Sequence, residues 1–159
     1  MTYETDSDTP TIRRLDDVPT GAPFGWLVQT LNGHDERLMN NVLPADFPYE
    51  VERGDAGDAL AAIAVREAMH RQIEDQRGSR VREAVELGAS WNEVAAALGV
   101  TTDDARALLR AWAEGQHRLY RRDVERAPDH PLGLDPDQYL AVLALTERGD
   151  DEQAEGAGR

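Results

Sequence analysis

The chain has 159 residues, of which 40% are hydrophobic and 30% charged, a balance that indicates one folded domain rather than a disordered polymer. It has no cysteine, which excludes disulfides, thiolate catalysis and cysteine-based metal sites. The formal net charge is −14. This charge argues against non-specific coating of nucleic acid, because that kind of binding depends on neutralising phosphates.

The negative charge is concentrated in the two flanks. Residues 1–60 hold 12 acids and 4 arginines, residues 61–126 hold 11 of each, and residues 127–159 hold 8 acids and 2 arginines. All 17 basic residues are arginine, a bias typical of GC-rich, for instance actinobacterial, genomes. Met1 is followed by neither a basic nor an apolar stretch, and no apolar run approaches the roughly 20 residues that span a bilayer. We therefore expect a cytoplasmic protein that does not bind a membrane.

The first 57 residues have the least regular pattern. Residues 1–10 are predicted to be a disordered tail, and residues 11–57 an irregular section rich in proline and glycine. Within it, Asn32-Gly33 is typical of a two-residue hairpin turn, but the same stretch also fits two short helices with a break at Gly33. The expected core residues of this section are Trp26, Leu27, Leu31, Leu38, Val42 and Phe47.

From Asp58 onward the pattern is helical. Apolar residues recur at spacings of three and four, which predicts one buried face; they are Leu60, Ile63, Ala64 or Val65, Met69 and Ile73. Gly78 and Ser79 either lie inside this helix or separate it from a second one, since glycine costs a helix interior only about 1 kcal/mol. Gly88 is expected to end it.

Residues 90–113 contain the start and stop signals of two helices joined by a tight turn. Ser90 and Glu93 form a capping box that begins a helix at Trp91, and Gly99 supplies the left-handed residue that ends it. Thr101 then caps a second helix, which is expected to continue to about Val124. The inward positions are predicted to be Val94, Ala95, Leu98, Val100, Ala105 and Leu108, with Leu109 and Trp112 beyond them.

Asp135-Pro136 begins a last helix, because aspartate is a good N-cap and proline suits the first helical position. It should end near Gly149 and bury Tyr139, Leu140, Leu143 and Leu145. Residues 150–159 are predicted to be an acidic, disordered tail. The expected fold is therefore mainly α, with about five or six helices in a domain over residues 58–149, and an irregular N-terminal section that holds either a small β-hairpin or short helices.

The stretch GASWNEVAAALGV, with Ala95, Gly99 and the apolar positions around them, resembles the helix-turn-helix DNA-binding proteins of actinobacterial type over about residues 81–112. The resemblance implies that the second helix enters the major groove of DNA. It assigns base and phosphate contacts to Thr101, Thr102, Asp103, Arg106, Ala107 and Arg110. Arg118, Arg121 and Arg122, further along the same helix, add a basic cluster that is either a set of phosphate contacts or a solvated helix face in a chain without lysine.

Asp103 and Asp104 depart from the usual pattern of that family, in which Arg, Gln or Ser often stands at these positions. Two carboxylates at a helix start stabilise the helix by about 0.3–1 kcal/mol each, because they face its positive end. They also occupy the place where a phosphate would lie. We interpret them as helix-start charges, although aspartate can also accept from the amino group of cytosine.

Nothing in the sequence predicts an enzyme or a cofactor. The four histidines, His34, His70, His117 and His130, lie far apart and none has a second ligand at the spacing of a helical metal site. There is no glycine-rich phosphate loop and no nucleophile motif.

The leading prediction is a small transcriptional or plasmid-type regulator that binds double-stranded DNA as a homodimer, with the Asp135–Arg148 helix as a candidate dimer contact. The alternative is an acidic protein-interaction module, antitoxin-like or an adaptor, that uses the helix-turn-helix as a scaffold and binds a basic protein. A negative exposed face on the second helix, with Arg106 and Arg110 engaged in ion pairs, would favour the alternative.

Overall fold

Residues 11–153 are described by a computed structural model, and within this range the fold is mainly helical with no strands. The disordered tail expected for residues 1–10 lies outside these residues. The elements, in chain order, are η1 (Leu15–Asp17), α1 (Phe24–Met39), η2 (Asn40–Val42), α2 (Ala56–Glu86), α3 (Trp91–Leu98), α4 (Thr102–Asp123) and α5 (Pro136–Thr146). The chain forms two compact units, one ending at Glu74 and the other beginning at Asp75, with α2 contributing to both.

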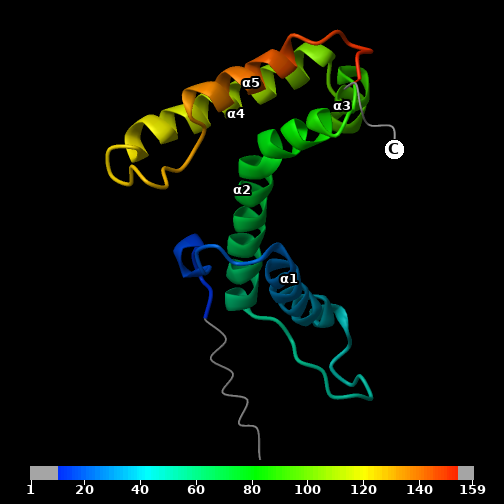
Figure 1. Cartoon of the computed structure of the whole chain (residues 1–159). Coiled ribbons are helices and arrows are strands. Elements are labelled where there is room, and N and C mark those ends of the chain that lie inside the picture. Colours follow the sequence, from blue (N-terminus) through cyan, green and yellow to red (C-terminus); the bar gives the residue numbers. More distant parts are fainter. Residues whose placement is uncertain (1–10, 154–159) are drawn as a thin grey trace, which may run out of the picture. The chain divides into compact units, whose positions relative to one another are not determined.

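In the first unit, α1 packs beside the first half of α2 (Figure 1). Ile12, Leu27 and Val65 are almost completely buried, and they form one apolar cluster together with Ala61 and Ala64. The loop between η2 and α2 is fastened by Arg53, whose guanidinium donates to the carbonyls of Asn40, Leu43 and Pro44.

The predicted hairpin is wrong, and so is the predicted break at Gly33. Asn32 and Gly33 lie inside α1, which runs without interruption from Phe24 to Met39. The helix-compatible spacing of Leu27 and Leu31, both of which contact the core of this unit, outweighs the local turn preference of Asn-Gly, which costs a helix only about 1 kcal/mol. Val42, expected in the core, is exposed.

The buried face of α2 in the first unit matches the predicted one in part: Ala64 and Val65 are buried and Met69 packs against the cluster, as predicted. Leu60, Ile63 and Ile73 are exposed, and the buried positions are Ala61, Ala62, Ala64 and Val65. The small alanine side chains are the ones turned toward Ile12 and Leu27, and small residues allow neighbouring segments to approach closely. The periodicity predicted the helix correctly, but packing against α1 determines which face of α2 is buried.

A charged cluster joins α1 to the start of α2. One carboxylate oxygen of Asp58 accepts from Arg37 Nη2 at 2.7 Å and Arg37 Nε at 2.9 Å, and lies 2.8 Å from His34 Nδ1. The other accepts from the backbone N–H of Asp55 at 3.0 Å. The hydrogen bonds from Arg37 and then from His34 hold the pKa of Asp58 well below its usual range.

Because the pKa of Asp58 is lowered by folding, its contribution to stability is present above the unfolded pKa of about 3.9 and is lost as the pH falls below that value. Asp58→Asn should therefore lower the free energy of unfolding at pH 7 by about 1.5–3 kcal/mol. The difference from the wild-type chain should shrink between about pH 4 and pH 2. Urea unfolding across this pH range measures it. The exposed Asp46 offers a control, Asp46→Asn, for which we expect little change at any pH.

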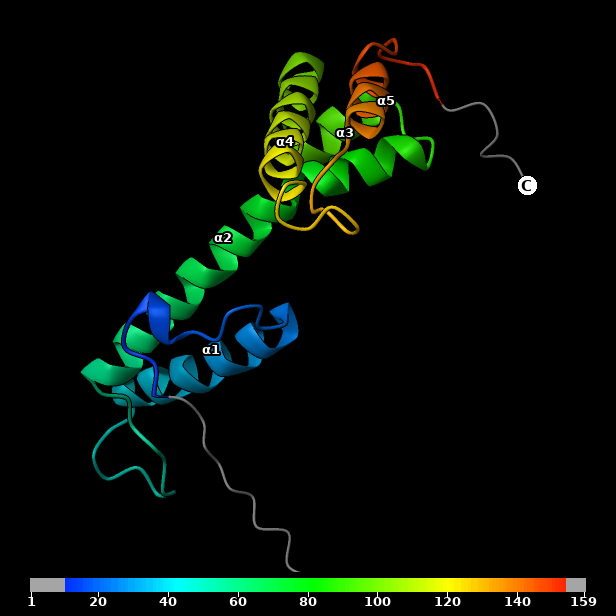
Figure 2. The same ribbon diagram turned by 60° about the vertical axis from the view of Figure 1, so that its left-hand side comes forward.

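The second unit is built from the end of α2 and from α3, α4 and α5. Gly78 lies within α2, so the helix continues through Gly78 and Ser79 rather than restarting. It is followed by Gly88 with a φ of 108°, as expected of a glycine that ends a helix. α4 and α5 lie side by side and antiparallel in both ribbon views (Figures 1 and 2). Gly133, with a φ of 94°, lets the loop before α5 pack onto the backbone of α4 at Gln116.

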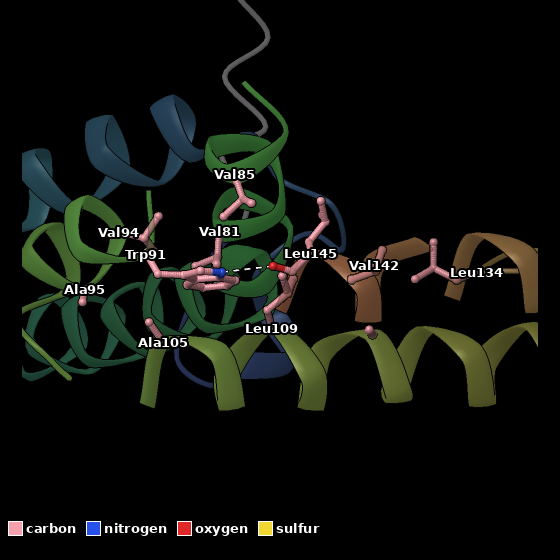
Figure 3. Close-up of a cluster of buried hydrophobic side chains, with 11 residues drawn as sticks. Val81, Val85, Trp91, Val94, Ala95, Ala105, Leu109, Leu134, Val142 and Leu145 are labelled. Atoms are coloured by element: carbon pink, nitrogen blue, oxygen red, sulfur yellow. Dashed lines mark hydrogen bonds between the residues drawn. The ribbon is translucent and has the colours of Figure 1, made fainter. Parts of the chain in front are cut away.

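Trp91 is the largest side chain at the centre of this unit (Figure 3). Its indole ring is 1% exposed, and its Nε1–H donates to the carbonyl oxygen of Leu145 at 3.0 Å. The surrounding cluster contains Val81, Val85, Val94, Ala95, Ala105, Leu109, Ala113, Leu134, Val142 and Leu145. One aromatic ring thus connects α3 with the end of α5. Leu140, predicted to be buried, is exposed.

Candidate functional site

The α3–turn–α4 segment has the local geometry that the sequence predicts. Ser90 caps α3 in a capping box with Glu93, and the hydrogen bonds to Ser90 hold the pKa of Glu93 below its usual range. Gly99 adopts the left-handed conformation with a φ of 68°, and Thr101 Oγ1 accepts from the backbone N–H of Asp104 at 3.1 Å. Val100 is the exception, since it is more than a third exposed instead of filling the space beneath the turn. The two helices are compatible with a helix-turn-helix.

Arg106 is the residue whose position most changes the interpretation of this segment. Its side chain is only 11% exposed. Its guanidinium donates to the carbonyl oxygen of Arg148 at 2.8 Å, pairs with the carboxylate of Asp150 at 2.5 Å and lies 5.4 Å from the centre of the Trp91 ring. A side chain held in this way cannot reach a base edge unless these contacts are broken.

The neighbouring candidates are also engaged by the C-terminal segment, which we define as residues 146–152. Thr102 Oγ1 lies 3.4 Å from the same Asp150 carboxylate. Arg110 Nε donates to Thr146 Oγ1 at 3.2 Å, and its Nη2 lies 3.8 Å from Glu147. Of the six residues that the resemblance assigns to base and phosphate contacts, Thr102, Arg106 and Arg110 contact this segment.

The C-terminal segment is also attached to α3. The backbone N–H of Asn92 donates to the carbonyl oxygen of Asp150 at 3.0 Å, and the Asn92 side-chain amide donates to the Asp151 carboxylate at 2.6 Å. Gly149 N–H donates to the Glu152 carboxylate at 2.9 Å, which turns the chain back on itself. Residues 150–152 are therefore held against α3 and α4, in contrast to the disordered tail that was expected to begin at residue 150.

The outward surface at the N-terminus of α4 is negative. The Asp103 side chain is 97% exposed and Glu147 79%, and Asp104 and Asp151 are exposed beside them. Asp150 remains 49% exposed even with Arg106 and Thr102 bound to it. Further along α4, Ala107 and Ala111 are also exposed.

The remaining predicted contacts lie at the other end of α4. Sixteen positions separate Arg106 from Arg122, which is about 24 Å along a helix axis. Arg118 pairs with Glu114 at 3.1 Å, while Arg121 and Arg122 are exposed and have no ion pair within residues 11–153. Together with Gly115, these three arginines line one open hollow. The predicted site residues thus fall into two groups with different surroundings.

No group of three His, Asp or Glu side chains within residues 11–153 is placed to hold a metal ion. His34 is bound to Asp58, and His117 stacks on Tyr139 with ring centres 4.6 Å apart while its Nδ1 lies 3.1 Å from the carbonyl oxygen of Leu134. None of the helices described between residues 11 and 153 has the length and apolar character of a bilayer-spanning segment.

Comparison with family models, with curated proteins and with solved structures found no match for the chain.

The sequence analysis did not identify Asn92, Thr146, Glu147, Asp150 and Asp151 as part of this site. The acidic run at residues 150–152 has the composition of a solvated tail, and no local pattern relates it to Arg106, 44 positions earlier. The opposite charges were the only indication of this contact, because α4 carries arginines and the C-terminal segment carries carboxylates.

Proposed function

We propose that this chain is an acidic protein-interaction module in which α3 and α4 serve as a scaffold, and that its partner is a basic protein. The observation that carries the proposal is the engagement of Arg106 by Asp150. The groups that would read DNA face the chain's own C-terminal segment, and the exposed groups around them are carboxylates. This is the arrangement that favours the alternative over a DNA reader, since a duplex would bring phosphates against Asp103 and Glu147.

The binding surface that we propose consists of Asp103, Asp104, Glu147, Asp150 and Asp151. Carboxylates at the start of α4 attract the arginines and lysines of a partner and speed association electrostatically. In the same unit, Leu140 on α5 is 61% exposed and offers further apolar contact area. Leu140 also supports the predicted role of α5 in a homodimer.

A selection of random displayed peptides against the full-length chain tests this proposal. The retained peptides should be rich in arginine and lysine, and Asp103→Asn with Asp104→Asn should weaken the best of them by about tenfold, since each lost ion pair with a charged group costs on the order of 1 kcal/mol. Asp129→Asn with Asp137→Asn removes the same charge from exposed positions elsewhere and should leave binding nearly unchanged. Peptides without basic residues, or equal losses in the two double variants, would refute the proposal.

Sequence-specific binding of duplex DNA is the second candidate function. It is supported by Arg121 and Arg122, which are exposed and free of ion pairs within the described residues. Their position in the last turn of α4 also suits the negative end of the helix, so the basic end of α4 has a structural explanation as well. A selection from random duplexes at about 150 mM salt separates the two functions. Under the leading proposal no sequence is enriched, and an enriched sequence that is lost with Arg121→Gln and Arg122→Gln would establish the second.

A further inference from the structure

The carboxylate of Asp150 lies against a set of groups at the start of α4 that suit an anion. It lies at the N-terminal turn of α4, 3.4 Å from Thr102 Oγ1 and 2.5 Å from an Nη of Arg106. A hydroxyl, a guanidinium and the positive end of a helix are a set of groups that binds a phosphate oxygen. In this chain an internal carboxylate takes the place of that phosphate.

The attachment of this carboxylate differs from that of the residues before it. Arg148 and Leu145 are bound through the backbone and core of the unit, because the Arg148 side chain donates to the carbonyl oxygen of Val85 and the Leu145 carbonyl accepts from Trp91. Asp150 and Asp151 are held from outside, by Asn92, Thr102 and Arg106, and both remain exposed. Displacing Asp150 and Asp151 would therefore remove the carboxylate that Thr102 and Arg106 bind, without opening the core.

We infer that Asp150 and Asp151 form a removable cover, and that α4 binds duplex DNA only when Asp150 is displaced. This inference rests on the second candidate function, duplex binding by α4. A basic partner bound to Asp150 would compete with Arg106 for the carboxylate, so the same acidic surface that binds the partner would control access to the helix. Arg106 remains oriented without Asp150, because the Arg148 carbonyl still accepts from it.

The experiment compares four full-length chains, namely wild type, Asp150→Ala, Glu152→Ala, and Asp150→Ala with Arg106→Ala. Glu152→Ala is the matched control, since it removes the same charge two positions away, where the carboxylate accepts from Gly149 and not from α4. Binding to a fluorescein-labelled mixed-sequence duplex is measured by anisotropy at about 50 mM and 150 mM salt.

Asp150→Ala should bind the duplex about tenfold more tightly than wild type, because one charged phosphate contact replaces an internal one. The slope of log binding constant against log salt concentration should also become steeper by about one, because one more phosphate is neutralised. Glu152→Ala should match wild type, and adding Arg106→Ala should remove the gain. Equal gains for Asp150→Ala and Glu152→Ala, or a gain that persists without Arg106, would overturn the inference.

The Asn92 amide donates to the carbonyl oxygen of Asp150, so its hydrogen exchange reports whether the cover is in place. This measurement distinguishes a wrong cover hypothesis from a wrong DNA-binding hypothesis. If this amide exchanges faster in Asp150→Ala than in wild type and yet none of the four chains binds the duplex, α4 is not a DNA-binding helix, and both the cover and the second function fail. If wild type binds the duplex as tightly as Asp150→Ala, duplex binding stands and the cover fails. Unchanged melting temperatures for the variants would show that each comparison concerns folded chains.

Discussion

Trp91→Ala should lower the free energy of unfolding of the second unit by about 3–5 kcal/mol, the range found for large aromatic side chains removed from a core. The ring is 1% exposed and borders side chains from α2, α3, α4 and α5 (Figure 3). Its removal also leaves the carbonyl oxygen of Leu145 without its donor and takes away the aromatic face beneath Arg106. The end of α5 should therefore loosen together with the core.

Amide hydrogen exchange measures this effect segment by segment, because the two units of the chain can differ in stability. Protection should fall in α3, α4 and α5, while α1, which has its own cluster around Leu27, should keep most of its protection. Trp91→Phe is a milder companion that retains most of the apolar area and loses the N–H donor, at a cost of about 1–3 kcal/mol. A loss below about 1 kcal/mol for the alanine variant would show that Trp91 is not the centre of this core.

Gly78→Ala and Gly115→Ala should change stability in opposite directions, although both replace a glycine inside a helix. At Gly78 an added methyl group would meet the Cβ and Cγ of Trp112 at distances that no real contact reaches. These atoms lie at the root of the side chain and cannot rotate away, so α2 and α4 would have to separate. Overpacking of this kind typically costs about 1–3 kcal/mol, more than the roughly 1 kcal/mol that alanine gains over glycine in a helix.

At Gly115 the nearest atom to an added methyl group is Nη2 at the flexible end of Arg118, at 3.9 Å. Gly115→Ala should therefore stabilise the chain by about 0.5–1 kcal/mol, through helix propensity alone. Thermal and urea unfolding of the two variants, followed by circular dichroism, gives the comparison. Stabilisation by both substitutions would mean that Trp112 does not pack on α2 at Gly78.

Capping signals were the most reliable guide to the second unit. Ser90 with Glu93, Gly99, Thr101 and Asp135 act at the positions predicted for them, because each depends on hydrogen bonds or backbone angles within four residues of sequence. The same kind of signal failed at Asn32-Gly33, where a turn preference of about 1 kcal/mol competes with the burial of Leu27 and Leu31. Local preference decides a boundary only where packing does not oppose it.

The candidate site was predictable in its location and not in its surroundings. The sequence indicated that a helix beginning after Thr101 carries Thr102, Arg106 and Arg110, and that the four-residue spacing of the two arginines places them on one face. It could not indicate that Asp150 would lie on Arg106, since that contact joins residues 44 positions apart through the antiparallel return of α5. Nor does the sequence show that the Asp103 side chain is 97% exposed while the Arg106 side chain, three positions later, is only 11% exposed.

The sequence by itself determined the mainly helical class, the boundaries of α3 and α4, the start of α5 and the left-handed turn at Gly99, because periodicity and capping act over a few residues; α5 ends at Thr146 instead of near Gly149. Only the tertiary structure decided which stripe of α2 is buried, why Gly78 must lack a side chain, and where the charge of Arg106 is neutralised. These depend on how closely segments distant in sequence approach one another, and that distance is fixed by the packing of whole helices.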